Sequence, residues 1–207
     1  MLHKFNKEDF FTKVNLHIHS TFSDGRVDFL DLIQEAEKLN LELFSITDHN
    51  TFEGYYTLEK IPPNMIIGIE FDCFIDLNLP HILGYGVDIN NEELKSLTAK
   101  FDRGKFSTLK RIFTSRNPKK VIEAIHNAGG IAVLAHPCCY WCISLDRFVQ
   151  KLVSYGLDGI EVYYPYNRLT RVVKFHSRKT VLKLAEKYNL IKTGGEDCHT
   201  SLIKENR

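Results

Sequence analysis

Residues 14–25 read VNLHIHSTFSDG, an apolar run that ends in two histidines and continues into a polar loop. In a β-strand, residues i and i+2 point to the same face, so His17 and His19 project together and can bind one metal ion. Asp24 follows in the loop and adds a carboxylate. The stretch therefore predicts a strand whose C-terminal end carries metal ligands.

This strand is the first of seven short runs rich in Val, Ile, Leu and Phe. The runs are Val14–His19, Leu43–Thr47, Met65–Cys73, His81–Val87, Gly130–Ala135, Gly159–Tyr164 and Leu190–Thr193. Runs this apolar, without clean alternation, are typical of strands that are covered on both faces, as in parallel α/β sheets.

Amphipathic helical patterns lie between several of these runs. Asp28 can cap a helix over Phe29–Leu39, and Ser144 can cap one over Leu145–Tyr155. Two further helices are expected over Lys119–Ala128 and Thr170–Tyr188. Because strands and helices alternate, the sequence predicts an α/β fold, either a barrel or a doubly wound sheet.

The overall composition fits one domain that spans residues 1–207. Lys and Arg number 27 against 26 Asp and Glu, so the formal net charge is +1. No apolar stretch is long enough for a membrane span or a signal peptide, and the five cysteines are expected to be reduced thiols. We expect a cytoplasmic protein without a membrane partner, and nothing in the sequence indicates an obligate protein partner.

One segment departs from this neutral balance. Residues 95–120 contain nine Lys or Arg and a single acid, Asp102, which gives a local charge of +8. Rough helical spacing of its apolar residues predicts one or two helices that form an insertion or lid. The basic face is either solvated only or an electropositive rim that attracts a phosphate-bearing substrate.

Side chains that can bind metal recur at one end of each of several runs. The full set is His17, His19, Asp24, His49, Glu70, His81, His136, Asp197 and His199. In barrel-like α/β folds the loops at the C-terminal strand ends converge on one mouth, so these residues should meet there. The nitrogen and oxygen donors suit Zn, Mn or Fe, and Glu70 can bridge two ions about 3.5–4 Å apart.

The alternative is that each histidine is an ordinary hydrogen-bonded residue at a strand end. Six histidines placed this way, two of them in a His-x-His pair, favour the metal site. The remaining three, His3, His126 and His176, lack this placement and are left out of the candidate site.

The order and spacing of these motifs resemble the PHP (polymerase and histidinol phosphatase) domain family. The resemblance rests on His17-x-His19 with Ser23-Asp24-Gly25, Thr47-Asp48-His49, Gly68-x-Glu70, His81-Ile82-Leu83-Gly84-Tyr85, Ala135-His136-Pro137, Gly159-Ile160-Glu161-Val162 and Gly195-x-Asp197-x-His199. It covers nearly the whole chain, and the sequence is most similar to stand-alone phosphoesterases that act on nucleotides or short RNA.

This resemblance implies a distorted (β/α)7 TIM-like barrel with three divalent metal ions at the C-terminal strand ends. One ion would be bound by His17, His19, Glu70 and Asp197. A second would share Glu70 and add His81 and His136, and a third would be bound by Asp24, His49 and His199.

The activity implied is metal-dependent hydrolysis of phosphate monoesters, on nucleotides or at RNA ends, by a metal-bridging hydroxide and without a covalent intermediate. Glu70, Asp197 and His199 are the expected catalytic residues, and the partner is a small phosphorylated substrate. The leaving-group acid is a metal-bound water, Asp197 or His199. Two alternatives are a histidinol-phosphate phosphatase and a metal-binding regulatory module without turnover.

The sequence indicates the phosphate-binding residues less clearly than the metal ligands. Relatives often carry an arginine in the loop after His136, where this chain has Cys139. Arg26, Arg147 and Arg168 are therefore the candidate substrate-binding residues. Cys139-x-x-Cys142 is a single CxxC motif without a second ligand pair, which argues against a structural zinc.

Overall fold

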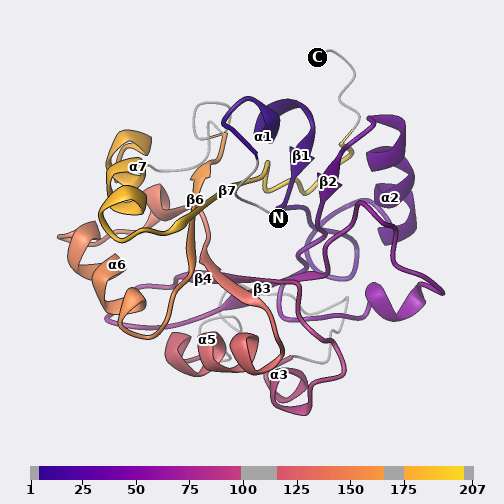
Figure 1. Ribbon diagram of the computed structural model, residues 1–207. Coiled ribbons are helices and arrows are strands. Elements are labelled where there is room, and N and C mark those ends of the chain that lie inside the picture. Colours follow the sequence, from indigo (N-terminus) through magenta and orange to yellow (C-terminus); the bar gives the residue numbers. More distant parts are fainter. Residues whose placement is uncertain (1–4, 99–115, 166–174, 203–207) are drawn as a thin grey trace.

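The computed structural model describes residues 5–98, 116–165 and 175–202 (Figure 1). Helices surround a central group of strands. The elements are α1 (Asp9–Thr12), β1 (Val14–Asn15), α2 (Phe29–Lys38), β2 (Leu43–Phe44), η2 (Tyr55–Thr57), β3 (Gly68–Asp72), β4 (His81–Tyr85), α3 (Glu92–Ser96), α5 (Pro118–Asn127), β5 (Ile131–Leu134), η3 (Pro137–Cys139), α6 (Leu145–Val153), β6 (Gly159–Tyr163), α7 (Arg178–Lys187) and β7 (Ile191–Gly194).

The seven strands overlap with the seven predicted runs and confirm the α/β class. Their pairing forms two sheets, β1-β2 and β3-β4-β5-β6-β7. Isolated parallel bridges join Ile18 to Cys198 and His49 to Glu70, so the two sheets approach each other on both sides. Within the described residues the strands do not form one closed ladder.

Strand β4 corrects the expectation of a parallel sheet, because it runs antiparallel to both of its neighbours. Asp72 at the end of β3 pairs with His81 at the start of β4. A chain that reverses between adjacent strands places the beginning of one beside the end of the other. His81, although it opens its strand, therefore lies at the same end of the sheet as Glu70.

The helices largely follow the predicted caps. Asp28 accepts from the backbone N–H of Leu30, and Ser144 accepts from that of Arg147, so α2 and α6 begin where expected. Helix α5 begins at Pro118 because Asn117 caps it.

Helix α7 corrects a prediction. It begins at Arg178, because Ser177 is extended and its side chain accepts from the N–H of Thr180. The expected helix at 175–177 is therefore wrong, and the expected start at Thr170 lies outside the described residues. Most of the basic segment, residues 99–115, also lies outside them.

Both faces of the larger sheet are covered. Ile82 and Leu83 are adjacent in β4, fully buried, and belong to two different apolar clusters. Successive residues of a strand point to opposite faces, so each face has its own core. This confirms the prediction from the unbroken apolar runs.

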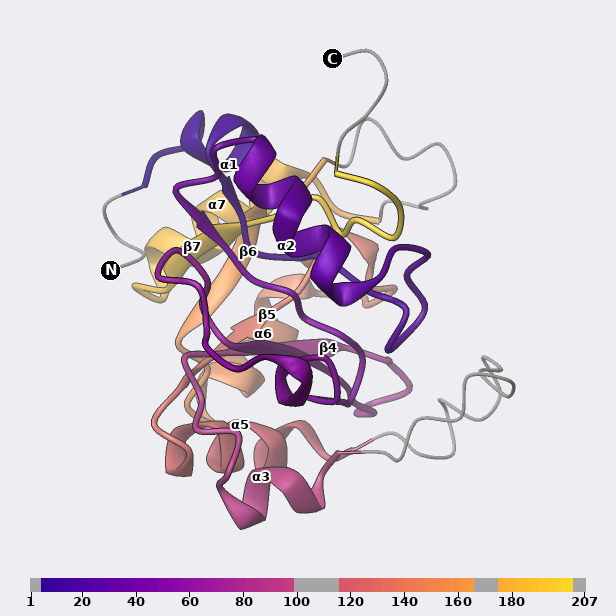
Figure 2. The same ribbon diagram turned by 90° about the vertical axis from the view of Figure 1, so that its right-hand side faces the viewer.

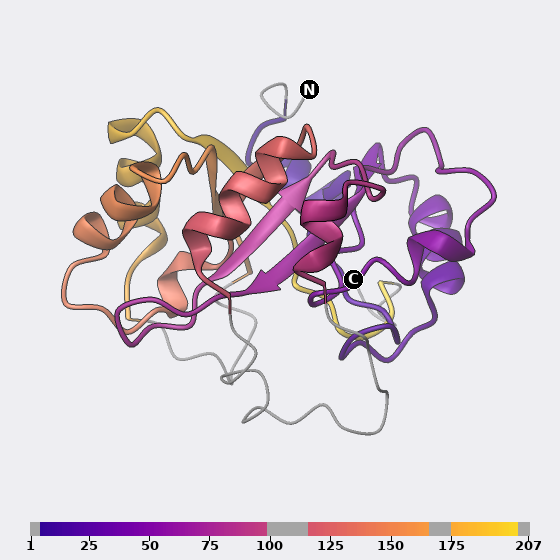
Figure 3. The ribbon, with the colours of Figure 1, turned by 90° about the horizontal axis from the view of Figure 1, so that it is seen from below.

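The outer helices complete the larger core. Val121 of α5, Val149 of α6 and Val181 of α7 are fully buried. Figure 3 shows α5 and α3 lying across the sheet, and α3 stays beside α5 in the turned view of Figure 2. Within the described part of the chain, no helix combines the length and apolar character needed to cross a membrane.

Candidate metal centre

The predicted ligands gather around a cavity of about 260 Å³. It is lined by Asp24, His49, Glu70, His81, His136, Cys139, Tyr164, Asp197 and His199. His17 and His19 lie beneath it and are fully buried. The structure thus brings together all nine residues that the sequence singled out as metal ligands, from six strands (β1, β2, β3, β4, β5 and β7) and the loops that follow them.

The first group consists of His17, His19, Glu70 and Asp197, whose ligand atoms lie within 4.8 Å of one another. Glu70 Oε2 is 3.2 Å from Nε2 of His17 and 3.1 Å from Nε2 of His19. Asp197 Oδ1 is 3.4 and 3.1 Å from the same two nitrogens. The four residues match the set expected for one ion.

The second group is Glu70, His81 and His136. The other oxygen of Glu70, Oε1, is 2.8 Å from Nδ1 of His81 and 3.2 Å from Nε2 of His136. One oxygen of this carboxylate therefore faces His81 and His136, and the other faces His17 and His19, with Nε2 of His49 also 3.4 Å away. That is the geometry needed for a carboxylate that bridges two ions.

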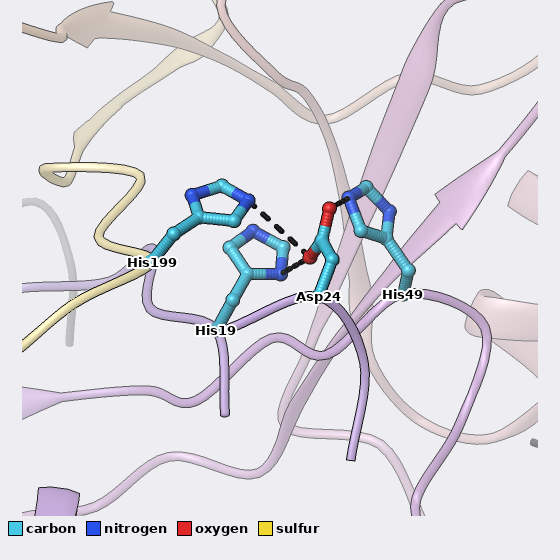
Figure 4. A group of neighbouring side chains, drawn as sticks. All are labelled: His19, Asp24, His49 and His199. Atoms are coloured by element: carbon cyan, nitrogen blue, oxygen red, sulfur yellow. Dashed lines mark ion pairs between the residues drawn. The ribbon is translucent and has the colours of Figure 1, made fainter. Parts of the chain in front are cut away.

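The third group contains Asp24, His49 and His199, and the structure adds His19 to it (Figure 4). Asp24 Oδ1 lies 3.3 Å from Nε2 of His199 and 3.6 Å from Nδ1 of His19. Asp24 Oδ2 lies 3.7 Å from Nε2 of His49. These separations leave the donor atoms of Asp24, His49 and His199 close enough to share one ion, while Nε2 of His19 belongs to the first group.

Charge and hydrogen bonding test whether the residues fit metal ions. Nε2 of His19 is buried and has no hydrogen-bond partner of acceptable geometry among the described residues, although two carboxylate oxygens lie 3.1 Å away. An imidazole nitrogen in this position is satisfied when it coordinates a cation. The donor set of imidazoles and carboxylates fits divalent Zn, Mn or Fe.

The ionisation of the acids agrees with that fit. Burial raises the pKa of Glu70, but the neighbouring imidazoles, led by His49 and His17, outweigh it and hold the pKa well below its usual value. Asp197 behaves the same way beside His17 and His19. Both acids are therefore carboxylates at neutral pH and available as ligands.

The backbone of the centre is strained. Asn50, His136 and Asp197 have φ values of 57°, 25° and 49°, in the region that non-glycine residues seldom adopt. Glycines permit close approach nearby: a β-carbon on Gly25 would overlap with the carbonyl oxygen of His19. This contact explains why glycine follows Asp24.

Several buried residues that support the ligands were not assigned a role from the sequence. Glu161 of β6 lies behind His17, and Asp72 of β3 lies behind His49 and His81. Asp48 accepts from the hydroxyls of Ser20 and Ser23, which lie in the loop that carries Asp24.. The only indication in the sequence that Glu161 and Asp48 have a role was their position within the family motifs.

Of the candidate phosphate binders, Arg26 and Arg147 are not among the residues that line the cavity. Arg26 is exposed, and its backbone N–H donates to the carbonyl oxygen of His199. Arg147 is exposed on α6. Arg168 lies outside the described residues. Cys139, in contrast, lines the cavity.

Comparison with known proteins identifies the family of the chain. The sequence matches the PHP domain family over residues 15–192. It is 26% identical to the phosphoribosyl 1,2-cyclic phosphate 1,2-diphosphodiesterase of Eggerthella lenta over 89% of this chain and 93% of that protein. It is 23% identical to the 5′-3′ exoribonuclease Rnm of Salmonella typhimurium over 89% of this chain and 84% of that one.

A solved structure shows the same fold. A candidate metal-dependent phosphoesterase from Bifidobacterium adolescentis superimposes with a TM-score of 0.72 at 22% identity, covering 95% of this chain and 90% of that one. The family match extends over most of the chain and includes the elements that carry the ligand groups, apart from Asp197 and His199 just beyond it. The chain therefore belongs to the PHP domain family.

Proposed function

We propose that the protein is a metal-dependent phosphoesterase that hydrolyses phosphate monoesters of nucleotides or short RNA ends. The observation that carries this proposal is the pair of oxygens of Glu70, which face two different sets of histidines. Family membership and the names of the similar proteins support the reaction class. The single-domain organisation over residues 1–207, the closed seven-stranded barrel and a cytoplasmic location belong to the same proposal.

The proposed centre holds three divalent ions. His17, His19, Glu70 and Asp197 would bind the first, Glu70 with His81 and His136 the second, and Asp24 with His49 and His199 the third. When bound, such ions act as Lewis acids, neutralise charge on phosphoryl oxygens and lower the pKa of water.

Asp197 is the residue best arranged to move a proton. Its Oδ1 faces His17 and His19, while its Oδ2 accepts a hydrogen bond from the hydroxyl of Tyr164 at 2.8 Å. Burial and the charge of Asp197 raise the pKa of Tyr164, so this hydroxyl keeps its proton. We assign to Oδ2 of Asp197 the transfer of a solvent proton to the oxygen of the leaving group.

His199 serves the proposed centre as a ligand rather than as a mobile acid. Its Nδ1–H donates to the backbone oxygen of Asp197 at 3.0 Å, and its Nε2 faces Asp24. Neither nitrogen then carries a proton that points at a leaving group. The sequence left a metal-bound water, Asp197 and His199 open as the acid, and between the two residues these contacts favour Asp197.

The size of the cavity supports a small substrate. About 260 Å³ accommodates a phosphate and part of the group that it esterifies. The two similar proteins named above act, by their names, on a cyclic ribose phosphate and on RNA. Phosphodiesters of these kinds are therefore the second candidate substrate class.

The test uses the purified chain, stripped with chelator and reloaded with Mn²⁺. We expect metal-dependent hydrolysis in a panel of phosphate esters. The readout is release of phosphate from nucleoside monophosphates, nucleoside bisphosphates, 5′-phosphorylated short RNA and histidinol phosphate, and ring opening to the monoester for a ribose cyclic phosphate. His17→Ala combined with Asp197→Ala should abolish turnover. His126→Ala is the matched control, because its partner is Asp158, outside the centre. Activity that survives both the double change and chelation would contradict the proposal.

A further inference from the structure

Asp72 is a buried carboxylate that contacts two of the proposed ligands at once. Its Oδ1 lies 3.2 Å from Nδ1 of His49 and 3.3 Å from Nε2 of His81. These two histidines belong to different ligand groups, one with Asp24 and the other with Glu70. Asp72 therefore links two parts of the centre through a single oxygen.

The other nitrogen of each imidazole faces the centre. Nε2 of His49 is 3.4 Å from Glu70 Oε2, and Nδ1 of His81 is 2.8 Å from Glu70 Oε1. A neutral imidazole has one N–H donor and one lone pair. If the nitrogens that face the centre bind metal, those that face Asp72 must carry the protons.

The acceptor oxygen is held in place from behind. Nδ2 of Asn50 donates to Asp72 Oδ2 at 2.6 Å, and the backbone N–H of Asp72 donates to Asn50 Oδ1 at 3.0 Å. Arg116 donates to the same Asn50 oxygen at 2.7 Å. With Oδ2 engaged by Asn50, Oδ1 is the oxygen directed at the two imidazoles.

A further cation site among His49, Asp72 and His81 is the competing interpretation, since their ligand atoms also lie within 4.8 Å. Such an ion would require both imidazoles to bind metal through both nitrogens. Each ring would then have to lose its remaining N–H proton, which a neutral imidazole does not readily do. Hydrogen bonding to Asp72 needs no such loss.

We propose that Asp72 is a positioning residue that fixes opposite tautomers of two ligands, protonating His49 at Nδ1 and His81 at Nε2. The inference rests on the proposed metal centre. Its consequence is that one buried oxygen directs Nε2 of the first ring and Nδ1 of the second toward the centre. Losing such a partner typically lowers metal affinity about 10–100-fold. A change of this size is within the range that binding measurements resolve.

The test is ¹⁵N NMR of the zinc-loaded protein labelled at histidine. We expect Nδ1–H for His49 and Nε2–H for His81, both protected from exchange. Reversed tautomers, or rings without these protons, would overturn the inference. This measurement needs no variant, so it decides the matter even where a substitution at Asp72 prevents folding.

A variant supplies the second measurement. In Asp72→Asn one side-chain atom becomes a donor, so it cannot both accept from the imidazoles and accept from Asn50. We expect zinc affinity to fall about 10–100-fold, whereas Asp146→Asn, the same change at a surface carboxylate, leaves it unchanged. Unchanged affinity in Asp72→Asn overturns this inference alone. A wild-type chain that binds no metal refutes the proposed function, and this inference with it.

Discussion

Oε1 of Glu161 lies 3.1 Å from Nδ1 of His17, and both side chains are buried. On the far side of the ring, Nε2 of His17 faces Glu70 and Asp197. The other oxygen of Glu161 accepts from the backbone N–H of His136 at 2.8 Å. One carboxylate on β6 therefore holds a ligand from the end of β1 and the loop that follows β5.

Replacing Glu161 with glutamine should weaken the centre while keeping its shape. The amide can accept from only one of its two present donors, and the other is left facing an N–H group. We expect metal affinity to fall about 10–100-fold and the free energy of unfolding to fall by about 1–3 kcal/mol. Metal titration and denaturant melts measure both, with the exposed Glu186→Gln as control. Wild-type affinity in Glu161→Gln would show that Glu161 does not hold His17.

Metal binding should strengthen as the pH rises. Burial lowers the pKa of His19, but Asp197 and Glu70 outweigh it and raise the pKa to about 10. Since the folded value exceeds the ordinary 6.5, the charged ring stabilises the metal-free fold fully below about pH 6.5. That stabilisation is lost as the pH rises toward about 10.

A divalent ion needs the neutral ring, so binding at neutral pH should release protons. Calorimetry in buffers of different ionisation enthalpy measures the release. The free energy of unfolding of the metal-free chain should fall between about pH 7 and about pH 9. Metal affinity that is independent of pH, with no proton release, would contradict the charged state of the empty centre.

Replacing Gly25 with alanine should disturb the loop that carries Asp24, and with it the third ligand group. A β-carbon there overlaps with the carbonyl oxygen of His19 and must displace the loop that carries Asp24. We expect the loss of about one bound ion from the three proposed, measured by elemental analysis of the dialysed protein. Gly86→Ala is the control, because alanine at its φ of 70° strains the backbone, but the added β-carbon meets no atom within 4 Å. Full metal content in Gly25→Ala would refute this role of the glycine.

Replacing Cys139 with serine should leave turnover nearly unchanged. The thiol lines the cavity, yet the proposed reaction needs no side-chain nucleophile. Steady-state rates and acid-quench trapping of phosphoprotein test this directly. A phosphorylated cysteine in the wild-type chain, absent from the variant, would replace the proposed mechanism by a covalent one.

The ligands could be predicted from the sequence because they follow local rules. His17 and His19 share a face through the two-residue period of a strand, and Asp197 and His199 follow the last strand. The apolar runs also predicted burial on both faces. These signals lie within a few residues of each other and need no knowledge of the tertiary structure.

The direction of β4 was missed, although a signal existed. Only residues 73–80 separate β3 from β4, whereas a parallel crossover needs about a dozen residues or more. The turn itself is unusual, since Asp76 and Leu77 have φ values of 50° and 61°. Hairpin turns of this conformation usually carry Asn-Gly or Asp-Gly. Here the second position is leucine, which is rare in that conformation, so the sequence lacks the usual signal of a hairpin.

The supporting carboxylates could not be predicted from spacing. Glu161 is 144 residues away from His17, and only the pairing of strands brings them together. Asp72 contacts His81 as well as His49 because β3 and β4 are antiparallel, which pairs Asp72 with His81. A role that depends on the register of distant strands leaves no local pattern in the chain.

The most direct test of the account is the anomalous scattering of a crystal of the manganese-loaded protein. We predict two peaks on either side of the Glu70 carboxylate, about 3.5–4 Å apart, and a third among Asp24, His49 and His199. The peaks should vanish with chelation, together with phosphoesterase activity. A fully active crystal with a single peak, or with none beside Glu70, would contradict the bridging role of this carboxylate.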